Sequence, residues 1–178
     1  GYTVADLHFS AALQEQTRTA LGEVIEASTD LMPVLVVGAP LPHRNRLYNC
    51  AVVIHRGEVL GVVPKSHLPN EREFQEPRWF AAGDDRMGDE IGAIGLGIEG
   101  SESVAFGADL VFEAADVPGF VFHVEIGQDL GVPIPPSARA ALGGATVLVN
   151  LSSSPITVGK SAERHEAVSY THLRAHET

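Results

Sequence analysis

Two short, unbroken apolar runs restrict the folds open to this 178-residue chain. Residues 34–38 (VLVVG) and 146–151 (TVLVNL) lack the alternation of a half-buried strand, and each run is typical of a strand buried on both faces by helices. A helical pattern starting at Ser10 precedes the first run, and a short helix over residues 138–142, capped by Ser137, precedes the second. This alternation predicts an α/β fold with mixed sheets.

The middle of the chain adds β-rich segments and one long polar stretch. Residues 47–54 and 58–63 are joined by His55-Arg56-Gly57, which predicts a hairpin, and residues 104–113 and 120–126 are two further expected strands. Residues 65–83 are polar and contain several charges, which indicates a loop. Long loops inside compact domains usually carry function.

The charge balance and the single cysteine exclude several classes of protein. Lys and Arg total 12 against 23 for Asp and Glu, so the net charge of −11 disfavours nucleic acid and anionic membranes as partners. Cys50 stands alone, which excludes an internal disulfide or a cysteine-based zinc site and fits a reducing compartment, so we expect a cytoplasmic protein. No run approaches the roughly 18 apolar residues of a membrane span.

Both ends of the chain look irregular. Gly1 replaces an initiator methionine, which suggests that the N-terminal portion of the fold is missing. Residues 168–178 (VSYTHLRAHET) continue no pattern and resemble translated adapter sequence, so we expect one partial domain over residues 1–167 and a non-native tail after it. The i, i+4 spacing of His172 and His176 in this tail lacks a third ligand, so no metal site is expected.

Few residues are candidates for chemistry when they are taken alone. A lysine at a strand exit, such as Lys65, is usually a solvated charge, although nearby Glu71, Glu73 and Glu76 could hold it to stabilise an oxyanion. Cys50 lies inside an apolar strand, where a thiol is typically inert. The serines of residues 152–154 lack a glycine-flanked nucleophile elbow and are more typical of a loop that donates hydrogen bonds.

Several segments together resemble a known family. PVLVVGAP, RLYNCAVVIHRGEVLGVVPKSHLPN, REF, RWFA, PGFVFHVEI and GATVLVNLSSSPITVGK closely resemble the glutaminase domain of glutamine-dependent NAD+ synthetases, in the nitrilase (carbon–nitrogen hydrolase) superfamily. The resemblance covers nearly all of residues 1–166. It implies an α-β-β-α sandwich and a Glu-Lys-Cys catalytic set, in which cysteine attacks the glutamine amide, lysine stabilises the oxyanion and glutamate is the general base.

The resemblance assigns roles to three residues. Lys65, in PKSHLP, matches the family lysine, and Glu73, in REF, matches a second glutamate that orients the site. Ser154, in SSSPIT, matches a serine that contacts the bound glutamine. The general-base glutamate of the family would lie a few residues before Gly1.

Four positions depart from the family pattern. The nucleophilic cysteine of the motif HVEICED is replaced by Gly127, and Gln128 replaces an acidic residue expected to pair with the glutamine ammonium group. Glu71 stands where tyrosine is usual and Lys160 where arginine is usual, and lysine cannot grip a carboxylate bidentately. The sequence therefore predicts a nucleophile turn without its nucleophile, and an inactive chain.

The resemblance implies a function for the intact parent. It would hydrolyse the glutamine amide and pass ammonia to a C-terminal synthetase domain that amidates nicotinic acid adenine dinucleotide. ATP and magnesium would be needed only in that absent domain, so this chain is expected to hold no cofactor, and the parent is expected to be a homo-oligomer. Two alternatives stay open: a non-catalytic nitrilase-like binding or assembly module, and a nitrilase-family amidase acting on another amide.

Overall fold

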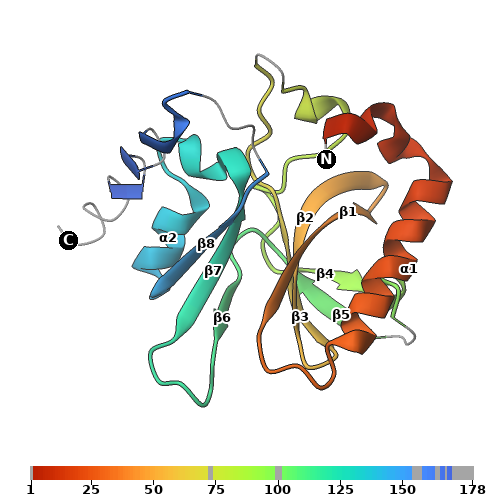
Figure 1. Ribbon diagram of the computed structural model, residues 1–178, viewed down its shortest axis with the longest axis horizontal. Helices are drawn as coiled ribbons and strands as arrows, with labels where there is room; N and C mark the ends of the chain where they lie inside the picture. Colours follow the sequence, from red (N-terminus) through yellow and green to blue (C-terminus); the bar gives the residue numbers. More distant parts are fainter. Residues whose placement is uncertain are drawn as a thin grey trace.

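The elements stack in four layers, helix, sheet, sheet and helix. A computed structural model describes residues 2–71, 74–98, 102–153, 158–162, 165–166 and 168–169. Figure 1 shows α2 (Pro136–Leu142) outside one sheet and α1 (Ala11–Ala27) outside the other, with the two sheets face to face between them. The predicted α-β-β-α sandwich is confirmed. No helix within the described ranges is long and apolar enough to cross a membrane.

The larger sheet has five strands in the order β1-β2-β3-β5-β4. β1, β2 and β3 are consecutive antiparallel strands, β5 runs parallel to β3, and β4 pairs antiparallel with β5. The bounds of these strands are β1 Leu35–His43, β2 Arg46–His55, β3 Glu58–Pro64, β4 Asp89–Gly92 and β5 Ser103–Phe106.

The smaller sheet has three strands in the order β6-β7-β8. β6 (Val111–Glu113) pairs antiparallel with β7 (Val121–Ile126), and β7 runs parallel to β8 (Val147–Leu151). Because β7 and β8 are parallel, their carboxyl ends meet at the same edge. Short 3-10 helices lie at η1 (Tyr2–Phe9), η2 (Glu76–Arg78), η3 (Ala93–Leu96) and η4 (Gly127–Gly131).

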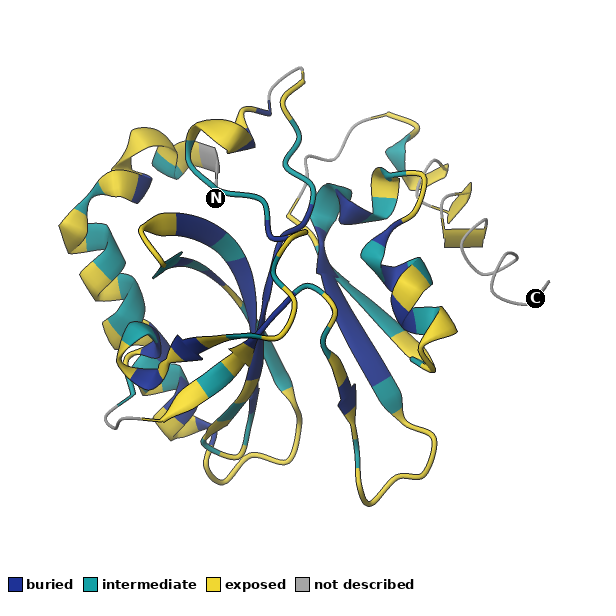
Figure 2. Ribbon diagram, turned by 180° about the vertical axis from the view of Figure 1, so that it is seen from behind, coloured by how far each residue is buried: buried dark blue, intermediate teal, exposed yellow. Residues whose placement is uncertain are grey.

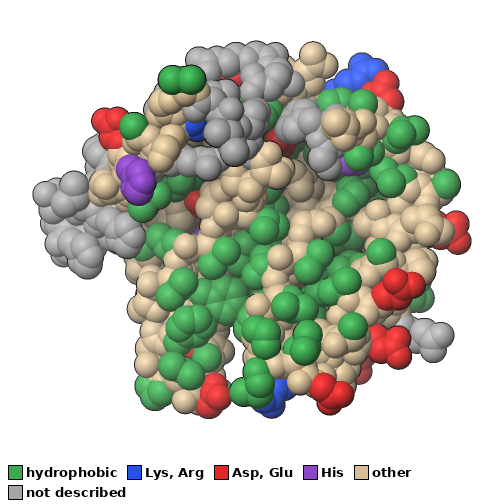
Figure 3. Space-filling view, in the orientation of Figure 1, with side chains coloured by type: hydrophobic (Ala, Val, Ile, Leu, Met, Phe, Trp, Pro, Cys, Tyr) green, Lys and Arg blue, Asp and Glu red, His purple; other side chains and the backbone are tan. Residues whose placement is uncertain are grey.

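Alternate residues of β2 pack into two separate hydrophobic cores. Ala51 and Val53 face the smaller sheet, where they pack with Phe112, Phe122 and Val124. Their neighbours in the strand face α1, in a cluster that includes Leu21, Ile25, Val52, Ile54 and Phe106. This two-residue period explains why β2 is buried along almost its whole length, as the dark strands in Figure 2 show. Figure 3 shows hydrophobic side chains along the seam between the two sheets.

The structure confirms the hairpin and the helix after Ser10, and it corrects other details. Residues 34–38 and 146–151 were expected to be buried on both faces, but β1 and β8 are edge strands of their sheets and these residues are half-buried or exposed. The expected single strand 104–113 is two strands, because the chain crosses from one sheet to the other between β5 and β6. Ser137 lies inside α2, whose N-cap is Pro135, and β4 was not expected.

Helix α1 approaches η3 through two glycines. A Cβ on Gly22 would lie 2.6 Å from the carbonyl oxygen of Gly97, and a Cβ on Gly97 would collide with the carbonyl oxygen of Arg18. Gly97 also has a φ of +78°, which side chains rarely adopt. The absence of two side chains therefore lets the helix backbone touch the loop that follows η3.

We expect Gly97→Ala to destabilise the protein strongly. Backbone atoms cannot yield as a flexible side chain can, so the collision and the left-handed φ together should lower the free energy of unfolding by about 3 kcal/mol. Urea denaturation measures this change. Gly92→Ala is the matched control, because a Cβ there meets nothing within 4 Å and φ is −68°. Equal stability of the two variants would contradict the backbone contact.

Candidate active site

The carboxyl ends of three strands lie at one edge of the sandwich, at the top of Figure 1. β3 ends at Pro64 and is followed by Lys65, β7 ends at Ile126 and is followed by Gly127, and β8 ends at Leu151. A cavity of about 870 Å³ opens at this edge. Its polar lining comprises His8, Asn49, Lys65, Glu76, Gln128, Asn150, Ser152, Ser153 and Lys160.

A buried ion pair lines part of the cavity. The Nζ atom of Lys65 donates to Oε1 of Glu76 at 2.7 Å, and the two residues are only 3% and 6% exposed. The prediction of a solvated lysine is therefore wrong, and the alternative of a lysine held by a carboxylate is confirmed. Burial makes such a pair sensitive to the loss of either partner. The lysine is thus fixed in position with its charge directed at the cavity.

Gly127 lies directly beside this lysine. A Cβ built on Gly127 would be 3.6 Å from the Nζ atom of Lys65. The φ of Gly127 is +55°, so the chain turns sharply out of β7 at the residue that the resemblance identifies as the nucleophile position. A side chain at this point would place its reactive atom next to a cation, where an anion is stabilised.

The carboxylate of Asp129 fastens the two loops of the site together. Its Oδ2 atom accepts the backbone N–H groups of Ile126 (3.1 Å) and Ser66 (3.3 Å), and its Oδ1 atom accepts that of His67 (2.6 Å). These bonds hold the turn after β7 against the residues that follow Lys65. Burial raises the pKa of the Asp129 carboxyl to about 6, and the three N–H donors and Lys65 oppose that shift.

The pKa of Asp129 predicts a pH dependence of stability. Because the folded pKa is raised above 3.8, the folded protein holds this proton more tightly than the unfolded chain does. Protonated Asp129 therefore adds on the order of 3 kcal/mol to the free energy of unfolding. This stabilisation is fully present below about pH 4 and is lost between about pH 4 and pH 6.

Urea denaturation at several pH values, with Asp129→Asn as the comparison, tests this expectation. The asparagine variant should be less stable and should lack this decline between pH 4 and pH 6. Asp89 has a lowered pKa because it bonds to His43, so its contribution changes only at lower pH. An identical decline in both proteins would show that Asp129 is not its source.

A second network fixes the turn from the side of β8. The Nδ2 atom of Asn150 donates to the carbonyl oxygen of Gly127 at 3.0 Å and to Oε1 of Glu125 at 3.1 Å. Oε2 of Glu125 accepts the backbone N–H of Ser137, at the start of α2. The turn at Gly127 is therefore held by hydrogen bonds from both sides, although it carries no side chain.

Aromatic residues and one histidine form the outer wall. The ring of His8 packs edge-on against Phe80, with centroids 4.8 Å apart, and its centroid lies 6.0 Å from that of Trp79. His8 is 7% exposed, and burial lowers the pKa of its imidazole. The sequence did not point to His8, Trp79 and Asn150 as site residues, because no local pattern links these distant positions.

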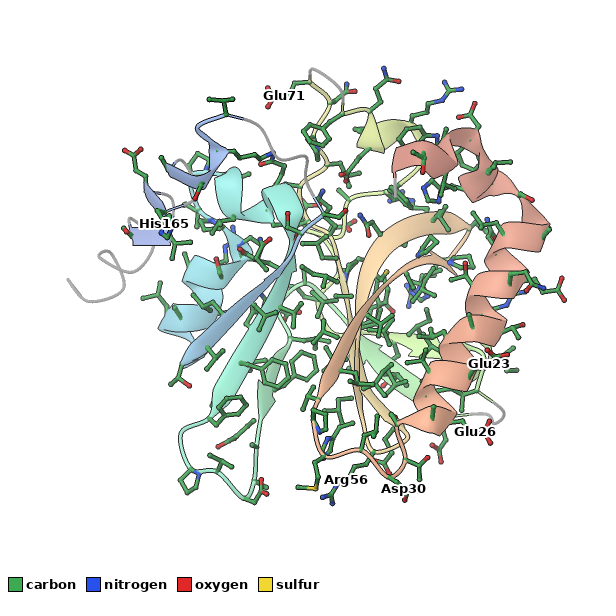
Figure 4. All side chains as sticks on the ribbon, viewed as in Figure 1. Glu23, Glu26, Asp30, Arg56, Glu71 and His165 are labelled. Atoms are coloured by element: carbon green, nitrogen blue, oxygen red, sulfur yellow. The ribbon has the colours of Figure 1, made fainter. Side chains whose placement is uncertain are left out.

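The structure places only some of the site residues predicted from the sequence at the cavity. Gln128 and Lys160 line the cavity, whereas Glu71 is exposed at the tip of its loop and does not line it (Figure 4). Glu73 and Ser154 lie outside the described residues, so their roles stay predictions. The carboxylate that the structure brings to Lys65 is Glu76, which the sequence analysis had only noted as a neighbour.

Other chemical candidates are also resolved by the structure. Cys50 is fully buried in β2, and burial raises the pKa of its thiol, which confirms the inert interpretation. His172 and His176 lie outside the described residues. Within the part of the chain that is described, no group of His, Cys, Asp and Glu side chains could hold a metal ion.

Comparisons with known proteins agree with this geometry. No protein-family model matches the chain. A glutamine-dependent NAD(+) synthetase of Mycobacterium tuberculosis is 57% identical over 164 residues, which are 92% of this chain and 23% of that protein, and one from Aquifex aeolicus is 29% identical over 160 residues, 90% of this chain and 24% of that protein. The chain therefore spans about a quarter of the length of these relatives.

Solved structures show the same fold. A glutamine-dependent NAD(+) synthetase from Cytophaga hutchinsonii has a TM-score of 0.76 at 26% identity, covering 94% of this chain and 25% of that one. An amidase of the nitrilase superfamily from Nesterenkonia has a TM-score of 0.66 at 16% identity, covering 93% and 52%. The second likeness concerns the fold alone.

The layered sandwich has the fold of an amidase of the nitrilase, or carbon–nitrogen hydrolase, superfamily, and its buried lysine–glutamate pair lies where β3 ends, beside the turn after β7. Over nearly its whole length, the chain matches a segment that makes up about a quarter of glutamine-dependent NAD(+) synthetases. The resemblance inferred from the sequence motifs is thereby confirmed.

Proposed function

We propose that this cavity is the glutamine site of a glutaminase and that the chain carrying Gly127 does not cleave glutamine. The intact parent would hydrolyse the side-chain amide and supply the ammonia to a synthetase domain for ATP-dependent synthesis of NAD+. The observation that carries the proposal is the buried Lys65–Glu76 pair, whose cation lies 3.6 Å from the Cβ position of Gly127.

Each part of the pair has a role in amide chemistry. An amide carbonyl placed at the end of β7 would have its oxygen near the Nζ atom of Lys65, which would stabilise the oxyanion of the tetrahedral intermediate. Glu76 would hold the lysine in this orientation through their 2.7 Å contact. The attacking sulfur is the missing part, because Gly127 has no side chain and Cys50 is enclosed in the core.

Ammonia and glutamate release from glutamine tests the proposal directly. We expect the chain to release neither above a control without protein, because loss of the attacking group typically costs about 10⁶ in turnover. Simple aliphatic amides serve as comparison substrates. Release from glutamine would contradict the proposed inactivity, and release from an aliphatic amide alone would favour the amidase alternative.

The role in NAD+ synthesis has its own test. A longer protein that joins this segment to a synthetase domain should make NAD+ from ammonium salts but not from glutamine, because free ammonia bypasses the defective site. ATP and magnesium would act only in that domain, and a homo-oligomeric, cytoplasmic parent is part of the proposal. A segment that is followed by no synthetase domain in its gene would instead favour a binding or assembly module.

A further inference from the structure

Few charged side chains line the cavity within the described part of the chain. They are Lys65, Glu76 and Lys160. The charges of Lys65 and Glu76 compensate each other across 2.7 Å, so the ammonium of Lys160 is left as the net charge. His8 adds none near pH 7, because burial lowers its pKa. The described lining is therefore cationic, and its one carboxylate is already paired with Lys65.

This charge distribution favours the carboxylate group of a bound amino acid over its ammonium group. A carboxylate can approach Lys160, which pairs with no described carboxylate. An α-ammonium group meets no unpaired carboxylate among the described lining residues, since the residue after Gly127 is the neutral Gln128. An ammonium group that loses water without gaining a counter-charge is costly to bind.

We propose that the cavity selects ω-amides of dicarboxylic acids that carry one carboxylate and no ammonium group, with glutaramate as the simplest example, over glutamine. Glutaramate has the carboxylate and side-chain amide of glutamine and lacks only its amino group. The proposal places its amide beside Lys65 and Gly127 and its carboxylate at Lys160, and these residues line the same cavity. The inference rests on the proposed function, because it assumes that this cavity binds a carboxamide.

Equilibrium binding to the 178-residue chain tests the preference, since a chain without a nucleophile leaves its ligand intact. Isothermal titration calorimetry compares glutaramate, glutamine and valeramide, which has no charged group. We expect glutaramate to bind about tenfold or more tighter than glutamine, and valeramide to bind weakly. Lys160→Met should weaken glutaramate and glutamine by a similar factor, because both ligands carry the carboxylate.

The matched variant is Gln128→Glu, which has nearly the same shape and adds one negative charge. This variant should bind glutamine about tenfold more tightly and glutaramate more weakly than the unaltered chain does. The order of the two affinities should therefore be reversed. Glutamine binding to the unaltered chain as tightly as glutaramate would overturn the inference and leave the proposed function standing. Binding of no amide at all would overturn both. The ratio in the unaltered chain decides the question even where a variant fails to fold.

Discussion

Gly127→Cys is expected to produce a reactive thiol that attacks glutamine, whereas the Gly127 chain leaves glutamine intact. The Cβ of the new residue would lie 3.6 Å from the Nζ atom of Lys65, so its sulfur would lie in the field of a buried cation. A neighbouring lysine lowers the pKa of a thiol below its usual value of about 8.5 and raises the thiolate fraction at neutral pH.

Two measurements check this expectation. The rate of alkylation by iodoacetamide against pH gives the pKa of the new thiol, and intact mass spectrometry detects a glutamyl thioester after incubation with glutamine. Cys50 does not interfere, because it is fully buried and its pKa is raised. The φ of +55° at residue 127 should make the cysteine variant about 1–2 kcal/mol less stable than the glycine chain.

The matched control adds Lys65→Met and Glu76→Leu to Gly127→Cys, because Lys65→Met alone should also destabilise the protein. Removal of the ammonium group should return the thiol to an ordinary pKa and abolish the glutamyl adduct. If the thiol were equally reactive with and without Lys65, the lysine would have no part in activating the site. The Gly127→Ser variant provides a second control, because a hydroxyl group ionises far less readily than a thiol and should stay unreactive beside the same lysine.

The sequence predicted the framework of the site better than its contacts. The strand that ends before Gly127 and the exit of Lys65 from β3 depend on local apolar patterns and turn residues, and both are present in the structure. The partner of Lys65 could not be chosen locally. Three glutamates lie within six residues of the sequence, and the 3-10 turn at η2, which no local pattern predicted, places Glu76 against Lys65.

The same limit explains the error over residues 104–113. Gly107-Ala108-Asp109 interrupts the β propensity there, but so short a break does not show locally whether one strand contains a bulge or the chain passes to another sheet. The division into β5 and β6 depends on the pairing of β5 with β3 and β4, and of β6 with β7, which are contacts between distant segments. The aromatic wall around His8 has the same origin, since residue 8 and residues 79–80 meet only in the folded chain.

Lys65→Met is expected to be among the most destabilising single changes in the protein. The carboxylate of Glu76 would lose its salt bridge to Lys65 in a site that is only 6% exposed. Removing one partner of a buried ion pair typically costs about 3–5 kcal/mol, because the other charge is left uncompensated, whereas replacing both partners with apolar residues of similar volume is often close to neutral.

Urea denaturation of Lys65→Met and of Lys65→Met/Glu76→Leu separates these effects, and the double variant should recover most of the lost stability. The pair between Arg78 and Asp6 is the surface control, since both side chains are more than half exposed and water screens their charges. Arg78→Met should therefore change the unfolding midpoint little. An equal loss of stability in the single and double variants would mean that packing around Lys65, and not the buried charge of Glu76, causes the destabilisation. Lys65 would then have no electrostatic role in holding the site together.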